Sequence, residues 1–295
     1  MVFLSNLING LSLGSVYAII ALGYTMVYGI SKMLNFAHGD VIMVGAYMSF
    51  CGTSYLNMPA WLSVIMAMAV CTVLGVLIEG LAYRPLRGTG SLAVLITAIG
   101  VSYFLQNAAL LIFGSAPKVF TSVVNGLGPS ISLFGGQLTV TWEAITTLLA
   151  AILIMIFMTL FIGKTKIGKA MRAVSEDNGA AQLMGININS TISMTFAIGS
   201  ALAAIAGVLL CSAYPALMPT TGAMPGIKAF TAAVFGGIGS IPGAMLGGIL
   251  IGVIEIFGRA YISSELSDAI VFGVLIIVLL VKPTGLLGKP IREKV

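Results

Sequence analysis

The sequence predicts an all-α polytopic membrane protein, a compact bundle of eight or nine membrane segments, and three observations carry this prediction. Of the 295 residues, 59% are hydrophobic and only 8% are charged, whereas soluble domains carry about 25% charged residues. The mean hydropathy is +1.10, and long apolar stretches recur along the chain. So few charges cannot cover a soluble protein of this length. Soluble enzymes, nucleic-acid-binding domains and disordered proteins are therefore excluded.

A stretch of about 20 apolar residues is long enough to cross the hydrocarbon core of a bilayer. Six stretches satisfy this condition: 7–29, 40–56, 60–82, 91–113, 141–163 and 191–214. The first charged residue is Lys32, so the chain lacks the basic start of a cleaved signal peptide, and we interpret the first stretch as a retained span. We expect one transmembrane domain over residues 1–295.

The C-terminal third departs from this pattern. Residues 227–240 are apolar but too short and too rich in glycine for an ordinary crossing, and apolar runs follow at 243–258 and 268–281. Irregular backbone at membrane depth occurs only where it is buried in protein or lines a water-filled cavity. The sequence therefore predicts a broken element beside a transport path. The glycines expected to allow close packing there are Gly236, Gly237, Gly239 and Gly243.

The distribution of Lys and Arg predicts the orientation, because cytoplasmic loops are enriched in both. With the N-terminus outside and 227–240 counted as one short crossing, eleven of these residues lie inside: Lys32, Arg84, Arg87, Lys164, Lys166, Lys169, Arg172, Lys282, Lys289, Arg292 and Lys294. Three lie outside: Lys118, Lys228 and Arg259. A re-entrant 227–240 would move the C-terminus outside and weaken this asymmetry. We favour an outer N-terminus and a cytoplasmic C-terminus.

The inner loop at 164–190 carries apolar residues at helical spacing, which indicates two short amphipathic helices. Glu176 and Asp177 interrupt the pattern, and Gly185 is placed to end the second helix. The apolar face of these helices either lies on the membrane surface or the underside of the bundle, or it docks a cytoplasmic subunit.

The turn at 35–40, N-F-A-H-G-D, joins the first two predicted spans. We expect Gly39 to permit a sharp turn, Asp40 to cap the next helix, and His38 to be a hydrogen-bonded structural group. Asn35, His38 and Gly39 are also candidate pathway or gating residues.

Three acids lie near apolar runs, where a charge is costly and often functional. Glu79 and Glu143 are placed to reach the membrane interface, whereas Glu255 lies four residues before Arg259, the spacing of a helical ion pair. We therefore retain only Glu255 as a functional candidate.

Composition also limits the chemistry of the chain. One histidine and three cysteines do not supply a His/Cys metal cluster or a histidine-dependent nucleophile triad. Gly163-Lys164-Thr165 matches the end of a phosphate-binding loop, but Met158 stands where the motif needs an earlier glycine. We expect no metal and no cofactor in this chain.

Four motifs in order resemble branched-chain amino acid ABC transporter permeases of the LivH type, and the resemblance runs over essentially the whole chain. These motifs are the N-F-A-H-G-D turn at 35–40, Y-R-P-L-R at 83–87, the glycine-rich block at 228–244, and P-T-G-L-L-G at 283–288. The loop at 164–190 is similar to the EAA loop that docks ABC permeases on their ATPases. Ala180, Ala181 and Gly185 match its core, Gly179 replaces its glutamate, and no downstream Leu-Pro follows.

The resemblance implies a bacterial inner-membrane importer subunit for Leu, Ile and Val. It also implies its partners: a second related permease, two cytoplasmic ATPases that bind ATP and Mg and hydrolyse ATP, and an external substrate-binding protein. Membrane lipid surrounds the chain, and no nucleic acid is involved. The contact residues implied for the ATPases are Glu176, Asp177, Ala180, Ala181 and Gly185.

Other functions remain open at this point. A sister branch carries urea or other small polar solutes. A proton- or sodium-driven transporter could use a broken helix and Glu255, but buried acids are few and the docking loop is conspicuous. An integral membrane enzyme lacks a general acid/base pair, and a channel lacks a ring of charges or a filter-like repeat.

Overall fold

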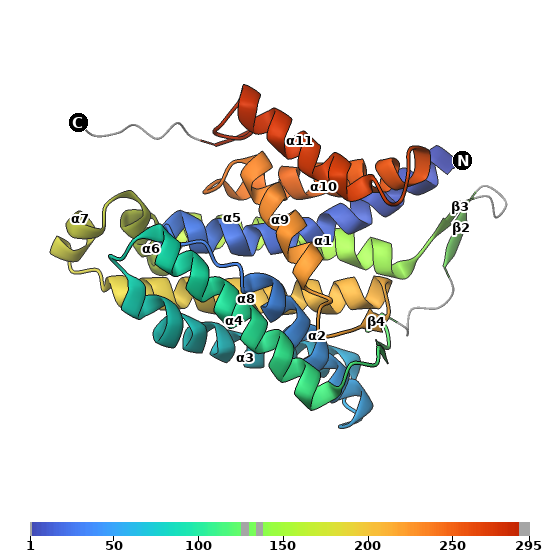
Figure 1. The fold of residues 1–295 in the computed structure, drawn as a ribbon, viewed down its shortest axis with the longest axis horizontal. Coiled ribbons are helices and arrows are strands. Elements are labelled where there is room, and N and C mark those ends of the chain that lie inside the picture. The colour runs from blue at the N-terminus through green and yellow to red at the C-terminus, as the bar shows by residue number, and fades with distance from the viewer. Residues whose placement is uncertain (1, 125–129, 134–137, 289–295) are drawn as a thin grey trace.

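The structure is a computed structural model that describes residues 2–124, 130–133 and 138–288, and this part of the chain is largely helical (Figure 1). The long helices are α1 (Val2–Ser31), α3 (Ala60–Ile78), α4 (Ser91–Phe113), α5 (Trp142–Lys164), α8 (Ile188–Ala213) and α10 (Ile241–Tyr261). The shorter ones are α2 (His38–Ser54), α6 (Lys166–Glu176), α7 (Asn178–Leu183), α9 (Ala223–Gly236) and α11 (Ser267–Val281). A π-helical turn (Glu79–Tyr83) and a 3-10 turn (Arg84–Leu86) continue α3.

Four short strands form two small antiparallel sheets at one end of the bundle. They are β1 (Lys118–Val119), β2 (Ile131–Leu133), β3 (Leu138–Val140) and β4 (Ala216–Leu217), and β1 pairs with β4 while β2 pairs with β3. In Figure 1 these strands lie at the end where α1 begins, whereas α6 and α7 lie at the opposite end. The bundle therefore has two structurally different ends.

The predicted fold class is confirmed. Six helices are long and apolar enough to cross a membrane. Five of them, α1, α3, α4, α5 and α8, correspond to predicted long spans, and the sixth is α10. The remaining predicted long span, 40–56, corresponds to the shorter helix α2. The helices α2, α9 and α11 contain 17, 14 and 15 residues. The prediction of eight or nine membrane segments thus depends on how these three shorter helices are counted. Lys289, Arg292 and Lys294, which entered the orientation argument, lie outside the described residues.

The core surrounds α1, which α8, α9 and α10 cover. Glycines bring these backbones together: a Cβ added at Gly14 would lie 2.7 Å from Cα of Ile249, and one at Gly252 would lie 2.2 Å from Cα of Gly14. Only glycine permits such an approach, as in other tightly packed membrane helices. Glycines of α1 and α10 thus serve packing within the chain.

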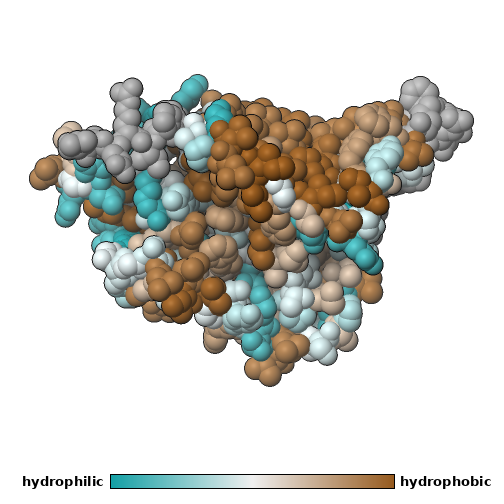
Figure 2. All heavy atoms as spheres, turned by 45° about the horizontal axis from the view of Figure 1, so that its top comes forward, coloured by the Kyte–Doolittle hydropathy of each residue, from teal (hydrophilic) through white to brown (hydrophobic). Residues whose placement is uncertain are grey.

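The outer helices carry large exposed apolar side chains, as expected for surfaces that contact lipid or another membrane subunit. On α11 these include Ile276, Ile277, Leu280 and Val281. Figure 2 shows hydrophobic side chains across much of the face that includes α10 and α11, with hydrophilic side chains gathered at the end that holds α6 and α7. The surface pattern fits a protein embedded in a bilayer.

The helices α2 and α9 both begin inside the bundle. After α1 ends, residues 32–37 turn back along it, so that His38 lies against Gly23, eight residues or about 12 Å from the end of α1. The first turns of α2 and α9 then meet, because a Cβ at Gly222 would lie 1.8 Å from the carbonyl oxygen of Gly39. Two helix N-termini therefore face one another within the bundle.

This contact corrects the expected role of Gly39. The residue lies within the first turn of α2, and it does not have the positive φ that a glycine-dependent turn would require. Its missing side chain instead lets α9 approach: a Cβ at Gly39 would lie 2.8 Å from the carbonyl oxygen of Gly222. Gly39 is needed for helix packing.

Candidate functional site

The residues of the N-F-A-H-G-D segment are held by long-range contacts. Asn35 Oδ1 accepts a hydrogen bond of 2.8 Å from the hydroxyl of Tyr83, which lies in the π-helical turn after α3. Both residues are buried. This bond joins two of the four sequence motifs. One of them begins in a π-helical turn, a feature that is uncommon and often occurs at functional sites.

His38 makes a structural hydrogen bond to the backbone of Ile20 as predicted, whereas Asp40 differs from its predicted role. His38 is buried with its ring 4.6 Å from that of Tyr24, and its Nε2 has no hydrogen-bond partner within the described structure. Asp40 does not cap α2, since Ala37 occupies the N-cap position. Its carboxylate accepts a hydrogen bond of 2.9 Å from Nε2 of Gln106 on α4. The first turn of α2 is therefore a buried polar site and not an exposed loop.

Glu79 also lies elsewhere than predicted. It is buried, forms an ion pair with Arg87, and accepts a hydrogen bond from the hydroxyl of Ser193 on α8. Arg87 in turn donates to Asn189 at the start of α8. The buried carboxylate is thus neutralised within the bundle, and the pair fastens the turn after α3 to α8.

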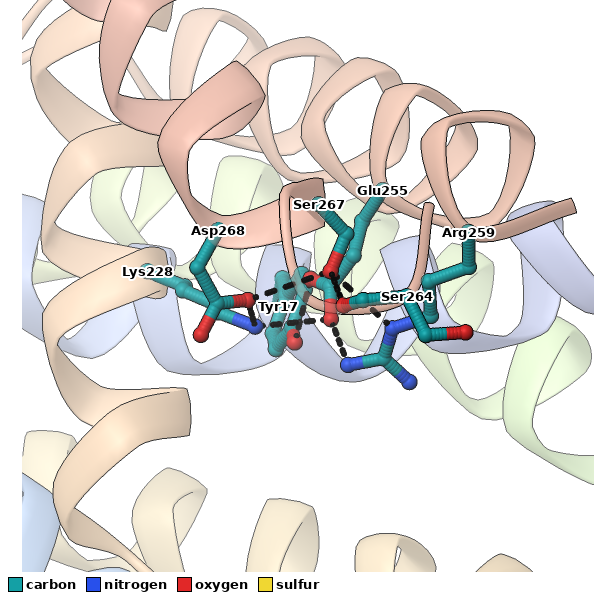
Figure 3. Close-up of polar contacts among 7 residues, drawn as sticks. All are labelled: Tyr17, Lys228, Glu255, Arg259, Ser264, Ser267 and Asp268. Atoms are coloured by element: carbon teal, nitrogen blue, oxygen red, sulfur yellow. Dashed lines mark hydrogen bonds and ion pairs between the residues drawn. The ribbon is translucent and has the colours of Figure 1, made fainter. Parts of the chain in front are cut away.

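Glu255 is the centre of a second ionic cluster, shown in Figure 3. It forms the predicted ion pair with Arg259, accepts a hydrogen bond of 2.8 Å from the hydroxyl of Tyr17, and lies 2.7 Å from Nζ of Lys228. Lys228 also contacts Asp268 at 2.6 Å. Two acids and two bases from α9, α10 and α11, with Tyr17 of α1, form a charge-balanced cluster.

This cluster encloses Lys228, which the distribution of charges in the sequence placed on the outer side. The residue lies within α9 and is 3% exposed. Sequence spacing had suggested only the Glu255–Arg259 pair, because these two residues are neighbours on one helix. The Lys228–Glu255 pair joins residues 27 positions apart, and only the packing of α9 on α10 brings them together.

The two helices predicted in the 164–190 loop are present as α6 and α7. Thr165 Oγ1 caps α6 and Asp177 Oδ1 caps α7, each by accepting a backbone N–H bond of 3.0 Å. Gly185, with a φ of +81°, follows the end of α7. Between the helices lies an open groove lined by Lys166, Lys169, Ala170, Ala173, Glu176, Asp177, Ala180, Ala181, Met184 and Ile186.

Exposure separates the residues at the end of α7, including the C-cap residue Met184, into two groups. Ala181 is only 3% exposed and packs within the chain, whereas Leu183 and Met184 are 91% and 82% exposed. Large apolar side chains so exposed at the polar end of the molecule form a surface suited to contact with another protein.

The glycine-rich break lies between α9 and α10. Gly237 and Gly239 have φ values of +106° and +94°, which favour glycine. A Cβ at Gly236 would lie 1.9 Å from the carbonyl oxygen of Gly243, so these two glycines permit close contact between the helices. The predicted close backbone packing is present at Gly236, Gly237 and Gly243, whereas a Cβ at Gly239 would meet nothing within 4 Å.

The P-T-G-L-L-G segment completes this region. The backbone N–H groups of Leu286 and Leu287 donate bonds of 2.9 Å to the carbonyls of Phe235 and Gly236, the last residues of α9. Helix ends leave such carbonyls without partners, so the segment satisfies them. Sequence reasoning gave no signal for this contact. In the part of the chain that the structure describes, no three His, Cys, Asp or Glu side chains form a metal-binding group.

Comparison with known proteins decides the family. Residues 6–279 match the family model described as "Branched-chain amino acid transport system / permease component". The chain belongs to this permease family. The resemblance drawn from the four motifs is thereby confirmed.

Several curated relatives of this permease cover nearly its full length. It is 48% identical to BraD of Pseudomonas aeruginosa, a high-affinity branched-chain amino acid transport system permease, over 99% of this chain and 98% of the relative. It is 47% identical to LivH of Escherichia coli K12, a permease of the same description, over the same shares. The ribose import permease RbsC of Haemophilus influenzae is 26% identical over 85% of this chain and 76% of that protein.

Proposed function

We propose that this chain is the membrane-spanning permease subunit of an ATP-driven importer of branched-chain amino acids. The observation that carries the proposal is the 48% identity to BraD over almost the whole length of both chains. The lower identity to the ribose permease favours an amino acid over a sugar. The chain itself performs no hydrolysis in this proposal.

The structure offers a surface on which the ATP-hydrolysing subunits could act. The helices α6 and α7 lie together at one end of the bundle (Figure 1), and α7 presents Leu183 and Met184 beside the groove that it forms with α6. Caps by Thr165 and Asp177 fix both helix starts, so that a push on the pair would be transmitted to α5 and α8, which flank it. We assign α6 and α7 to ATPase docking. A second related permease and an external binding protein complete the proposed importer.

The test is leucine uptake by proteoliposomes that contain the purified complex, with the external binding protein added. Uptake should require ATP on the side of α6 and α7 and should continue when a protonophore collapses the proton gradient. Uptake that needs the gradient and proceeds without ATP would place the chain among secondary transporters. Uptake of urea without uptake of leucine would assign the sister branch.

A further inference from the structure

Asp40 is unlike the other fully buried acids of the chain. Glu79 contacts Arg87, and Glu255 contacts Lys228 and Arg259. Asp40 is 1% exposed, yet across residues 2–124, 130–133 and 138–288 no Lys, Arg or His side chain forms an ion pair with it. Its side-chain hydrogen bonds come from neutral groups of α4, the amide of Gln106 at 2.9 Å and the hydroxyl of Ser102. A buried carboxylate is costly unless it is paired, so the charged form of Asp40 has hydrogen-bond donors but no cationic partner within the described residues.

Gln106 connects this carboxylate to an outward face of α4. A second contact joins the same two helices: the rings of Tyr47 and Phe113 stack with centroids 4.1 Å apart. The residues of this pair are as far apart in the sequence as Asp40 and Gln106 are, so both contacts advance along α2 and α4 in the same direction. The helices α2 and α4 therefore run parallel there. Gln106 is half-buried, so its amide lies between the enclosed carboxylate and the outer surface of α4.

Two exposed polar side chains interrupt the otherwise apolar surface near the middle of α4. Tyr103 is 63% exposed and Asn107 is also exposed, and both lie within about 8 Å of the midpoint of α4 at 1.5 Å per residue. A polar side chain at this depth is disfavoured in contact with lipid and typically faces a bundle interior or a water-filled cavity. Such side chains would suit a face of α4 that borders the transport path in the assembled importer.

The transported molecule supplies the charge that Asp40 lacks. A branched-chain amino acid carries an α-ammonium group, which loses water as it enters an apolar bundle and then needs a carboxylate or several acceptors. We propose that Asp40 binds the α-ammonium group of the substrate during transport, and that the ammonium displaces the amide of Gln106. This inference rests on the proposed function and adds a substrate-binding residue to it.

The first variant is Asp40→Asn, which removes the charge but keeps an oxygen that accepts the bond from Gln106. Leucine uptake by the complete importer should fall by about tenfold or more, the effect of losing one charge-assisted hydrogen bond. The melting temperature of the purified complex should stay the same or rise, because an unpaired buried charge has been removed. Asp40→Glu should recover part of the uptake.

Glu79→Gln is the matched control, because it makes the same chemical change at a buried acid that has a basic partner. It should lower the melting temperature, since Arg87 is left without its carboxylate. An Asp40→Asn variant that transports leucine at the wild-type rate would overturn the inference, and so would one that loses stability as Glu79→Gln does. A wild-type complex that takes up no branched-chain amino acid would instead contradict the proposed function.

Discussion

Lys228 must be neutralised where it lies, because α9, α10 and α11 enclose its ammonium group. Two carboxylates serve this purpose: Glu255, which is fully buried, and Asp268, which is 41% exposed. Arg259 supplies a second positive charge to Glu255 but is itself 39% exposed. The cluster is therefore asymmetric, with Lys228 and Glu255 at its enclosed centre and Arg259 and Asp268 at its edge.

This asymmetry predicts unequal effects of two similar substitutions. Lys228→Met leaves the enclosed carboxylate of Glu255 with only the partly exposed Arg259, and it should lower the free energy of unfolding by about 3–5 kcal/mol, the range for breaking a buried pair. Arg259→Met should cost clearly less, because Glu255 keeps Lys228 and the lost pair is partly exposed. Thermal unfolding of both variants in the same detergent gives the comparison. Equal losses would mean that the two bases contribute alike.

Individual residues show what sequence reasoning reaches and where it stops. The Glu255–Arg259 pair followed from helical spacing, and the glycines of the break followed from composition. Lys228, Gln106 and Arg87 were not recognised as partners of buried acids, because each pairing depends on how separate helices pack. Gly39 was assigned to a turn because the sequence does not show that it contacts Gly222, which lies at the start of a distant helix.

At the scale of elements, the α6–α7 pair is the part of the fold that sequence predicted best. Local signals suffice there: an apolar period and a glycine after α7. The sequence did not show which side of α7 is free, because burial of Ala181 depends on packing within the folded chain. A large residue at Ala181 would thus disturb the chain itself, so Leu183 and Met184 are the sharper probes of docking.

Replacing Leu183 and Met184 together by Ser should release the ATPase subunits. Burying one such apolar side chain in a contact contributes roughly 1.5–3 kcal/mol, and serine removes most of the apolar area that each could bury. The ATPases retained on the purified permease are measured by pull-down. Leu56→Ser, an exposed apolar residue in the loop after α2, is the control and should retain them. Full retention by the double variant would exclude α7 from the docking surface.

The whole molecule combines an enclosed α1, apolar outer helices and two different ends. The charges distinguish these ends more clearly once Lys228 is placed inside the bundle. Among the described residues, those assigned to the outer side are then only Lys118 and Arg259. Those assigned to the inner side are Lys32, Arg84, Arg87, Lys164, Lys166, Lys169, Arg172 and Lys282. The correction at one residue thus strengthens the asymmetry on which the predicted orientation rests.

Labelling with a membrane-impermeant thiol reagent tests this orientation. In a background with the three native cysteines replaced by Ala, Ser264→Cys places an exposed thiol after α10, and Gln182→Cys places one on α7. With the basic end cytoplasmic, Ser264→Cys should react in intact cells whose outer membrane has been made permeable. Gln182→Cys should react only after the inner membrane is opened, because α7 lies beside the basic start of α6. The reverse pattern would turn the protein over in the membrane and place the proposed docking helices on the side that lacks ATP.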